Sequence, residues 1–257
     1  MTNLSSHDIL VLICMVDLTD RQLHILKVII EEYIDTAMPV ASETLDKKYN
    51  LGVSPATIRN EMVRLTTSGY LKQPHTSAGR TPTPLALKFY VDRLMKPKEL
   101  SVSDEVSVKQ NIWDHRKEMD ELLREATRTL AKQSKTLSLA ATDEGDFFTS
   151  GIGNILEMPE FYDIDITKHL LDTLDEAEYW WKILSGYSDQ DESLYILVGE
   201  EFGGNLLNNC GGIFVSFRSA EHKGAIGVVG PTRLNYSRLV PVVRYMGSLI
   251  NDLAKNL

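Results

Sequence analysis

The chain has 257 residues and an apolar share of 43%, which is long enough for two domains that each bury a core. Its formal net charge of −9 argues at first sight against a nucleic-acid partner. The charge is unevenly distributed, however. Residues 47–96 carry nine bases and two acids, a net charge of +7, whereas residues 99–257 carry 15 bases and 26 acids, a net charge of −11. A basic segment joined to an acidic one is expected when one end of a protein contacts a polyanion.

The cysteines and the N-terminus indicate a cytoplasmic protein. Cys14 and Cys210 lie far apart in the sequence without metal-like spacing, which is typical of a reducing compartment. The apolar run at 9–16 is far shorter than a membrane span and lacks the flanks of a secretion signal. We therefore expect no membrane partner, and we expect residues 1–18 to form an N-terminal extension that is either disordered or short and packed.

The first half of the chain begins with two predicted helices. Thr19 and Gln22 have the spacing of a capping box, and the apolar residues that follow recur at helical spacing, which predicts a helix over residues 20–36. Ser42 is expected to cap a second, shorter helix that ends near Tyr49.

A third helix and a hairpin follow. Ser54 precedes a proline, which is the favoured arrangement at a helix start, and Gly69 provides a left-handed stop. Short extended segments then flank a loop of small and basic residues at 75–80. Three helices followed by a hairpin is the order of a winged helix-turn-helix domain. We assign this domain, with a fourth helix behind the hairpin, to residues 19–97.

The remainder of the chain mixes helices and strands, so the predicted fold class is α+β. A long polar helix is expected within residues 98–136 and is interpreted as a linker that also offers one face to a partner subunit. Residues 137–257 are predicted to form an α+β domain. Its expected elements are strands at 137–141, 193–198, 212–217 and 225–229 and helices at 165–174, 176–184 and 236–253.

The third helix has one apolar side and one polar side. Ile58, Met62 and Leu65 share the side that is expected in the core. The other side suits the major groove, where arginine pairs with guanine, asparagine pairs with adenine and small apolar groups meet thymine methyls. A hydroxyl at the helix N-terminus suits a phosphate. A plain solvated face is the alternative. The residues predicted to contact DNA here are Ser54, Ala56, Thr57, Arg59, Asn60 and Arg64.

Two further segments are predicted to contact DNA. The small residues at the tip of the hairpin allow its backbone to approach DNA, and an arginine there can reach a phosphate or the minor groove; an ordinary flexible hairpin is the alternative. Two lysines end the second helix, where they meet phosphates or simply complement the helix dipole. The residues concerned are His75, Thr76, Ser77 and Arg80 in the hairpin and Lys47 and Lys48 in the helix.

Features of the C-terminal half have structural interpretations. The turn after a buried-looking strand at 225–229 lacks the glycine spacing and the lysine of nucleotide-binding loops, so Arg233 and Arg238 are expected in internal or interface ion pairs. Four aromatic residues are expected in the core, with a protein interface as the alternative. They are Tyr179, Trp180, Trp181 and Tyr187.

Enzyme chemistry is not indicated. The six histidines are dispersed and form no HExxH or zinc-binding pattern, Cys210 has no neighbouring histidine in the sequence, and no GxSxG motif occurs. We expect no catalytic residues, no cofactor and no metal.

Several blocks of the sequence resemble a known family. SPATIRNEM at 54–62, GYLKQPHTSAGRTPT at 69–83 and FYVD at 89–92 are similar to the signature of the heat-inducible transcription repressor HrcA family. Nearer the C-terminus, GNILEMPEF, LVGEE and GAIGVVGPTRLNYSR resemble later blocks of that family. The resemblance covers most of the chain apart from the N-terminal extension.

The resemblance implies a repressor of heat-shock (chaperone) genes. Members bind a double-stranded, inverted-repeat DNA operator (the element called CIRCE) as a homodimer, and the chaperonin GroEL tunes repression. The resemblance further implies that residues 137–257 form a GAF-like regulatory and dimerisation domain. A large block that the family carries between Gly145 and Gly153 is absent here. That block holds part of the GAF-like core and an inserted dimerisation segment, so the resemblance predicts a shortened GAF-like domain.

Without the inserted segment, we expect the chain to dimerise through the helix at 103–135 and the C-terminal block at 230–253. The polar helix carries apolar residues that it is not expected to bury alone, and these motivate the prediction. They are Ile112, Trp113, Met119 and Leu123.

Two other classes of function compete with an operator-binding repressor. A small-molecule-sensing winged-helix regulator requires an apolar pocket with converging polar groups in residues 137–257, and the shortened domain disfavours it. A winged helix used only for protein interaction has no need of Arg59, Asn60 and Arg64 on one exposed face together with Arg80 in the hairpin.

Overall fold

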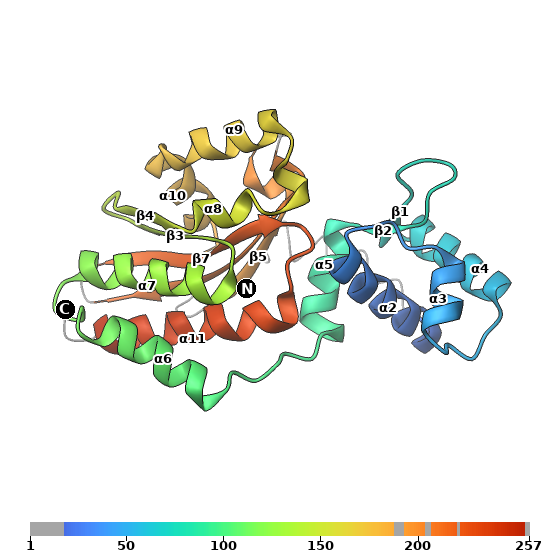
Figure 1. The fold of residues 1–257 in the computed structure, drawn as a ribbon, viewed down its shortest axis with the longest axis horizontal. Coiled ribbons are helices and arrows are strands. Elements are labelled where there is room, and N and C mark those ends of the chain that lie inside the picture. Colours follow the sequence, from blue (N-terminus) through green and yellow to red (C-terminus); the bar gives the residue numbers. More distant parts are fainter. Residues whose placement is uncertain (1–17, 188–192, 204–206, 220–221, 255–257) are drawn as a thin grey trace, which may run out of the picture. The chain divides into compact units, whose positions relative to one another are not determined.

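The computed structural model describes residues 18–187, 193–203, 207–219 and 222–254 (Figure 1). The expected N-terminal extension therefore lies, apart from its last residue, outside the described residues, as does Cys14. The chain divides into two compact units, Met1–Met95 and Lys96–Leu257, and combines helices with two antiparallel sheets. Within the described ranges, the helices are all too short or too polar to cross a bilayer.

The first unit contains helices and a two-stranded hairpin, in the predicted order. Leu71 pairs with Pro82 across the hairpin, and Val40 forms an additional antiparallel bridge with Arg80. The elements are α2 (Asp20–Thr36), α3 (Ser42–Lys48), α4 (Pro55–Thr67), β1 (Leu71–Lys72), β2 (Thr81–Pro82) and α5 (Pro84–Phe89), followed by a turn of π-helix (Tyr90–Leu94).

Side-chain caps fix the ends of α2 and α4. Thr19 accepts a hydrogen bond from the Gln22 amide at 3.3 Å, and the Gln22 side chain accepts one from the Thr19 amide at 2.9 Å, which confirms the predicted capping box. Ser54 caps α4 by accepting a hydrogen bond from the Thr57 amide at 3.2 Å. Gly69, which follows α4, has the left-handed φ of +79° that the predicted stop requires.

One predicted cap is wrong. Ala41 is the N-cap of α3, and no side chain caps this helix. Ser42 is the first residue inside the helix, where it is buried. The serine is therefore part of the packed surface of α3.

The second unit is built on a five-stranded antiparallel sheet with the strand order β4-β3-β7-β6-β5. All strands and helices predicted within residues 137–257 are present, and β4 and α8 are additions. The strands are β3 (Leu137–Thr142), β4 (Phe147–Ser150), β5 (Leu194–Val198), β6 (Cys210–Arg218) and β7 (Lys223–Pro231). The helices are α6 (Val102–Trp113), α7 (Met119–Ser134), α8 (Ile152–Ile155), α9 (Ile164–Leu174), α10 (Ala177–Ser185) and α11 (Tyr236–Ala254), with 3-10 turns at Pro159–Phe161 and Gly199–Phe202.

Helices cover both faces of this sheet. Helices α7 and α11 pack on one face, and α8 and α10 pack on the other, with α9 beside α10 (Figure 1). Trp180 of α10 is fully buried, donates a hydrogen bond from its indole nitrogen to the Thr173 carbonyl at 2.9 Å, and meets Phe202 edge-on at 6.1 Å between ring centroids. The core interpretation of the aromatic cluster is thus confirmed for Trp180, and Tyr179, Trp181 and Tyr187 pack around the same core.

The single long helix predicted over residues 103–135 is wrong. The structure has two helices, α6 and α7, separated by residues 114–118. Arg116 donates a hydrogen bond to the Trp113 carbonyl at 2.6 Å and so satisfies one acceptor at the end of α6. No glycine or proline lies at this break. The break separates α6, in which Val108 is buried, from α7, in which Leu122 is buried beside the sheet.

This break also removes the observation behind the predicted dimer contact. Ile112, Met119 and Leu123 are buried within the second unit, so they are not available to a partner subunit. Of the four apolar residues, Trp113 alone remains exposed, at 42%. The polar helix covers its own apolar side by packing within the unit.

Helix α11 approaches strand β6 closely at a glycine. A Cβ atom added to Gly247 would lie 2.5 Å from Cγ1 of Val215, which is shorter than any normal contact. The absence of a side chain at this position therefore sets the distance between α11 and the sheet.

Gly247→Ala is expected to lower the free energy of unfolding by about 1–3 kcal/mol, because the added methyl overpacks the contact with Val215. This loss outweighs the roughly 1 kcal/mol that alanine gains over glycine in a helix. Urea unfolding measures the effect. When Val215→Ala is already present, the glycine substitution should cost less than it does alone. An equal cost in both backgrounds would show that the close approach is not limiting.

Candidate nucleic-acid interface

Helix α4 has the two sides that its sequence predicts. Ile58, Met62 and Leu65 are buried, and the core assignment of these three is confirmed. Because these residues lie in the core, the opposite side of the helix faces solvent. The exposed residues there are Ala56, Arg59, Asn60, Val63 and Arg64, with Thr57 half-buried.

Both arginines on this exposed side contact carboxylates. The Arg59 guanidinium lies 2.7 Å from Oε1 of Glu43 on α3, and both side chains are well exposed. Arg64 lies 3.4 Å from Oε1 of Glu61, which is buried on the inner side of α4. Glu61 also accepts a hydrogen bond from the Gln22 side chain at 3.1 Å. The arginines are thus held in place by neighbouring acids.

Lys48 makes a structural ion pair. Its ammonium lies 2.5 Å from Oε2 of Glu32, and the Tyr49 hydroxyl donates to the same oxygen at 2.6 Å. The pKa of Glu32 lies below its ordinary value, first because of the hydrogen bond from Lys48 and then because of the one from Tyr49. Since Glu32 is only 5% exposed, Lys48 supplies the positive charge that this buried carboxylate requires. Lys47, in contrast, is exposed at the end of α3.

The loop between β1 and β2 presents His75, Thr76 and Ser77 to solvent. Gln73 holds the loop from within, because its amide donates hydrogen bonds to the carbonyls of Thr76 at 2.9 Å and Ala78 at 3.0 Å. The loop is therefore supported by side-chain hydrogen bonds and presents small polar groups at its tip.

Arg80 lies at the base of this loop, which corrects the prediction that it belongs to the tip. Its backbone exchanges two hydrogen bonds of 2.8 Å with Val40, and its side chain donates from Nε to Thr66 Oγ1 at 3.1 Å. The same close approach requires a glycine at the neighbouring position 79, because a Cβ atom on Gly79 would lie 2.4 Å from the Val40 carbonyl oxygen. Close packing against Val40 thus explains this glycine without any reference to DNA.

Both C-terminal arginines make internal contacts, and the predicted internal ion pair is confirmed for Arg233. Arg233 forms a two-point ion pair with Glu160, in which Nη2 of Arg233 lies 3.1 Å from Oε2 of Glu160. Arg238 donates a hydrogen bond to the Gln133 carbonyl at 3.3 Å. Burial raises the pKa of the Cys210 thiol to about 12, so this cysteine behaves as a core residue.

Sequence reasoning missed the acidic partners of the cations. The sequence did indicate a partner for Arg64, because Glu61 lies three residues before it, and residues three apart on a helix are neighbours. Glu61 also lies four residues before the buried Leu65. Glu32 and Glu43 lie sixteen residues from Lys48 and Arg59, and only the packing of α2, α3 and α4 brings each pair together.

A model of the HrcA protein C terminal domain matches residues 87–240 of this chain. The heat-inducible transcription repressor HrcA of Ruminiclostridium cellulolyticum is 27% identical, with 91% of this chain and 97% of the relative aligned. The protein of the same name from Desulforudis audaxviator is 26% identical, with coverages of 93% and 98%. This places the chain among transcription repressors, a class distinct from enzymes. The chain belongs to the HrcA family.

The fold is shared with a solved structure, described as the crystal structure of a hypothetical protein at 2.2 Å resolution. The TM-score is 0.72 at 17% sequence identity, and the match covers 93% of this chain and 99% of the other.

The relatives are longer than this chain. Their alignments extend over 337 and 338 positions, whereas this chain has 257 residues. Residues 143–146 join β3 directly to β4, and the Thr142 amide donates to the Asp146 carbonyl at 3.0 Å to close the turn. This hairpin lies where the sequence comparison with the family predicts the missing block to begin.

Glu32→Gln is expected to lower the free energy of unfolding at pH 7 by about 1–3 kcal/mol, because it removes a charged acceptor from Lys48 and Tyr49. The pKa of Glu32 is lowered in the folded state, so the stabilisation is fully present above the ordinary value of 4.5 and is lost as the pH falls through the lower folded value. Urea unfolding between pH 7 and pH 3 measures this difference.

The difference in stability between the parent protein and Glu32→Gln should therefore narrow below about pH 4.5. Asp46→Asn, at an exposed position on α3, serves as the control and should change little. A difference for Glu32→Gln that stays constant across the pH range would contradict a stabilising charge on Glu32.

Proposed function

We propose that this chain is a sequence-specific repressor of heat-shock (chaperone) genes that binds an inverted-repeat DNA operator as a homodimer. In this proposal, residues 19–97 are a winged helix-turn-helix domain, α4 enters the major groove, and the β1–β2 loop is the wing. The single observation that carries the proposal is the side of α4 opposite Ile58, Met62 and Leu65, which presents Arg59 and Asn60 to solvent.

The arrangement of the first unit supports the winged-helix assignment. Three helices precede the hairpin, and the bridge between Val40 and Arg80 ties the segment between α2 and α3 to the residue just before β2. This bridge fixes the base of the loop beside the segment that leads into α3. The loop tip is then available for a phosphate or for the minor groove.

The contacts of Arg59 suit base recognition. The ion pair between Arg59 and Glu43 is exposed to solvent, which weakens such pairs, whereas a bidentate contact with a base discriminates by about 1–3 kcal/mol. The carboxylate therefore orients the guanidinium in the free protein without preventing its contact with guanine. Asn60 can pair with adenine, and the exposed Ala56 and Val63 can meet thymine methyl groups.

Other residues of the proposed interface would position the duplex. Ser54 lies at the N-terminus of α4, where the positive end of the helix dipole favours a phosphate. Lys47 and the exposed loop residues His75, Thr76 and Ser77 can contact the backbone. Lys48 and Arg80 have structural contacts of their own, so we assign them a secondary share of the phosphate binding. Thr57 and Arg64 complete the proposed set.

The proposed dimer follows from the two-fold symmetry of an inverted-repeat operator. One winged helix contacts too little DNA for a specific search of a genome, and two-fold operators are read by two copies. We assign residues 137–257, which form the sheet with the strand order β4-β3-β7-β6-β5, to the shortened GAF-like regulatory and dimerisation domain. The family resemblance also supports the chaperonin GroEL as the partner that tunes repression.

Packing in the second unit disfavours the alternative of a small-molecule sensor. The space between the sheet and α10 is filled by Trp180, Phe202 and Phe214, all of which are fully buried. Hollows beside α6 are open to solvent and are lined in part by Lys109 and Gln110. Neither feature is the enclosed apolar pocket that a ligand sensor requires.

The test of the proposal is selection of bound sequences from a random DNA pool with the purified protein. An inverted repeat is expected among the selected sequences. Arg59→Ala and Asn60→Ala should each weaken binding to that operator by about 1–3 kcal/mol and relax the preference at one base position per half-site. The matched control is Arg93→Ala, because Arg93 is also an exposed arginine paired with a carboxylate. Unchanged operator affinity in both α4 variants would overturn the assignment of α4.

Lys47→Ala is expected to weaken binding to operator and random DNA by the same factor, because a phosphate contact carries no sequence information. The slope of log affinity against log salt should shrink by about 0.9 for the lost contact. Lys27→Ala on α2, where Lys27 lies 3.9 Å from Glu31, is the control. A change of base preference with an unchanged slope would contradict a phosphate contact. Lys48→Ala is unsuitable here, since it strands the buried Glu32.

A further inference from the structure

Arg59 is held by a carboxylate from a different helix. Nη2 of Arg59 donates a hydrogen bond of 2.7 Å to Oε1 of Glu43, and the two side chains are 69% and 57% exposed. Arg64, the other arginine on the exposed side of α4, instead contacts Glu61 of its own helix, which is buried. Glu43 therefore brings a negative charge from α3 to the residue that is proposed to read guanine.

The carboxylate of Glu43 is anchored at the start of α3. Glu43 lies in the first turn of this helix, where the free backbone amides favour a negative charge. The pKa of Glu43 lies below its ordinary value, first because its own backbone amide donates a hydrogen bond to the carboxylate, and further because of a hydrogen bond from Ser42 and the charge of Arg59. Glu43 is thus an ionised acceptor fixed to α3, and Arg59 reaches it from α4.

An acid at this position opposes binding to a polyanion. Lys47, the exposed lysine predicted to contact phosphate, lies four residues after Glu43, and residues at this spacing share one side of a helix. The Glu43 carboxylate is therefore close to cations that the proposed interface offers from both α3 and α4. A phosphate that approaches these cations also approaches the carboxylate, and like charges repel. Glu43 thus weakens binding to DNA in general, unless a feature of the operator compensates.

The shape of the guanidinium provides that compensation. Arginine carries several N–H donors in a planar fork, and the contact with Glu43 uses one nitrogen, Nη2. The remaining donors, on Nη1, on Nε and on Nη2 itself, are sufficient for the paired hydrogen bonds that guanine O6 and N7 accept. Guanine can therefore bind Arg59 without displacing Glu43. A backbone phosphate carries a negative charge and competes with the carboxylate for the same guanidinium.

We propose that Glu43 is a specificity-determining residue that favours the contact of Arg59 with guanine over its contact with phosphates. Glu43 acts as a positioning residue in two ways: it holds the guanidinium in place for a base edge, and its charge opposes the phosphates of random DNA. Specificity is a difference between two affinities, so it increases when the wrong complex is weakened. The inference rests on the proposed function, because it requires α4 to enter the major groove.

Glu43→Gln tests the proposal, because glutamine keeps the length of the side chain and removes its charge. Binding of the full chain to the selected operator and to random DNA is measured over a range of salt concentrations. Affinity for random DNA should rise on the order of threefold per bound copy. The slope of log affinity against log salt for random DNA should steepen by up to about 0.9 per copy, because Arg59 is released to a phosphate. Affinity for the operator should change less, so the ratio of the two affinities should fall.

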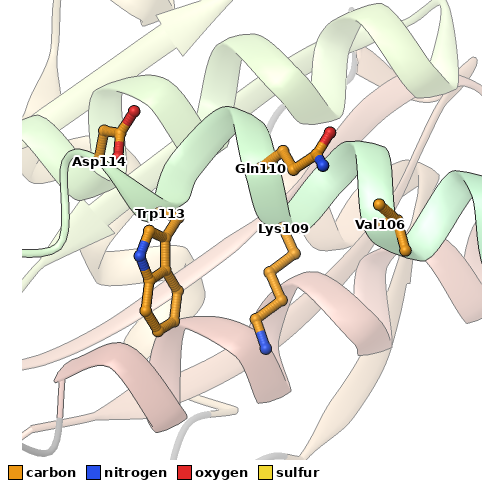
Figure 2. Close-up of a pocket in the computed structure, with 5 residues that line it drawn as sticks. All are labelled: Val106, Lys109, Gln110, Trp113 and Asp114. Atoms are coloured by element: carbon orange, nitrogen blue, oxygen red, sulfur yellow. The ribbon is translucent and has the colours of Figure 1, made fainter.

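Two control variants remove the same negative charge elsewhere. Asp46→Asn acts at an exposed position on α3, and Asp114→Asn acts at an exposed residue beside α6 in the second unit (Figure 2). Both should leave the ratio of operator affinity to random-DNA affinity close to that of the parent chain. All three positions are exposed, so none of the changes disturbs the core. An equal effect of either control would show that net charge alone is responsible, and would overturn the role of Glu43.

Arg59→Ala decides whether Glu43 acts through Arg59. In that background, Glu43→Gln should neither steepen the slope for random DNA nor alter base preference. In the parent chain, Glu43→Gln should relax the preference at the same base position that Arg59→Ala affects. An effect of Glu43→Gln that persists without Arg59, or a loss of preference at a different base position, would show that Glu43 contacts DNA directly and would overturn the proposal.

The outcomes separate this inference from the proposed function. If Arg59→Ala weakens operator binding while Glu43→Gln leaves both the random-DNA affinity and its salt slope unchanged, α4 reads the operator and the role of Glu43 falls. If no inverted repeat is selected and Arg59→Ala does not change the affinity for DNA, the proposed function falls, and the role of Glu43 falls with it.

Discussion

The burial of one side of α4 is the constraint on which the proposed interface depends. Ile58, Met62 and Leu65 lie in the core of the first unit, and this fixes the rotation of the helix about its axis. The rotation in turn decides that Arg59 and Asn60 face solvent. Ser54 fixes the start of the same helix by capping it. A surface that reads bases must be held rigidly, and here the apolar side of the helix provides that rigidity.

Acidic residues accompany the cations of this unit. Glu32 balances Lys48, Glu61 holds Arg64, and Glu43 contacts Arg59. The buried acids are structural, because an unpaired carboxylate in the core would be costly. The exposed pair of Glu43 and Arg59 is weak enough to exchange one partner for another. The net charge of the basic segment thus overstates the number of cations that are available to a polyanion, whereas Lys47 is exposed at the end of α3.

The second unit is organised by a five-stranded sheet in which a tight hairpin joins β3 to β4. The four residues at 143–146 close β3 onto β4, so the strand order is unbroken although the longer relatives carry additional residues. Helices α7 and α11 and the buried Trp180 fill the two faces. Ile112, Met119 and Leu123 are buried within this unit, so the sequence-based prediction that they contact a partner subunit is not supported.

The elements of the first unit, the two sides of α4 and the family could all be predicted from the sequence, because caps, helical spacing and motifs are local signals. The same signals also predicted nearly all the strands and helices of the second unit. Only the tertiary structure decided where the polar helix breaks, since no glycine or proline marks residues 114–118 and packing on the sheet separates α6 from α7. The position of Arg80 and the acid partners of Arg59 and Lys48 were likewise decided by packing, because those contacts join residues that are far apart in the chain.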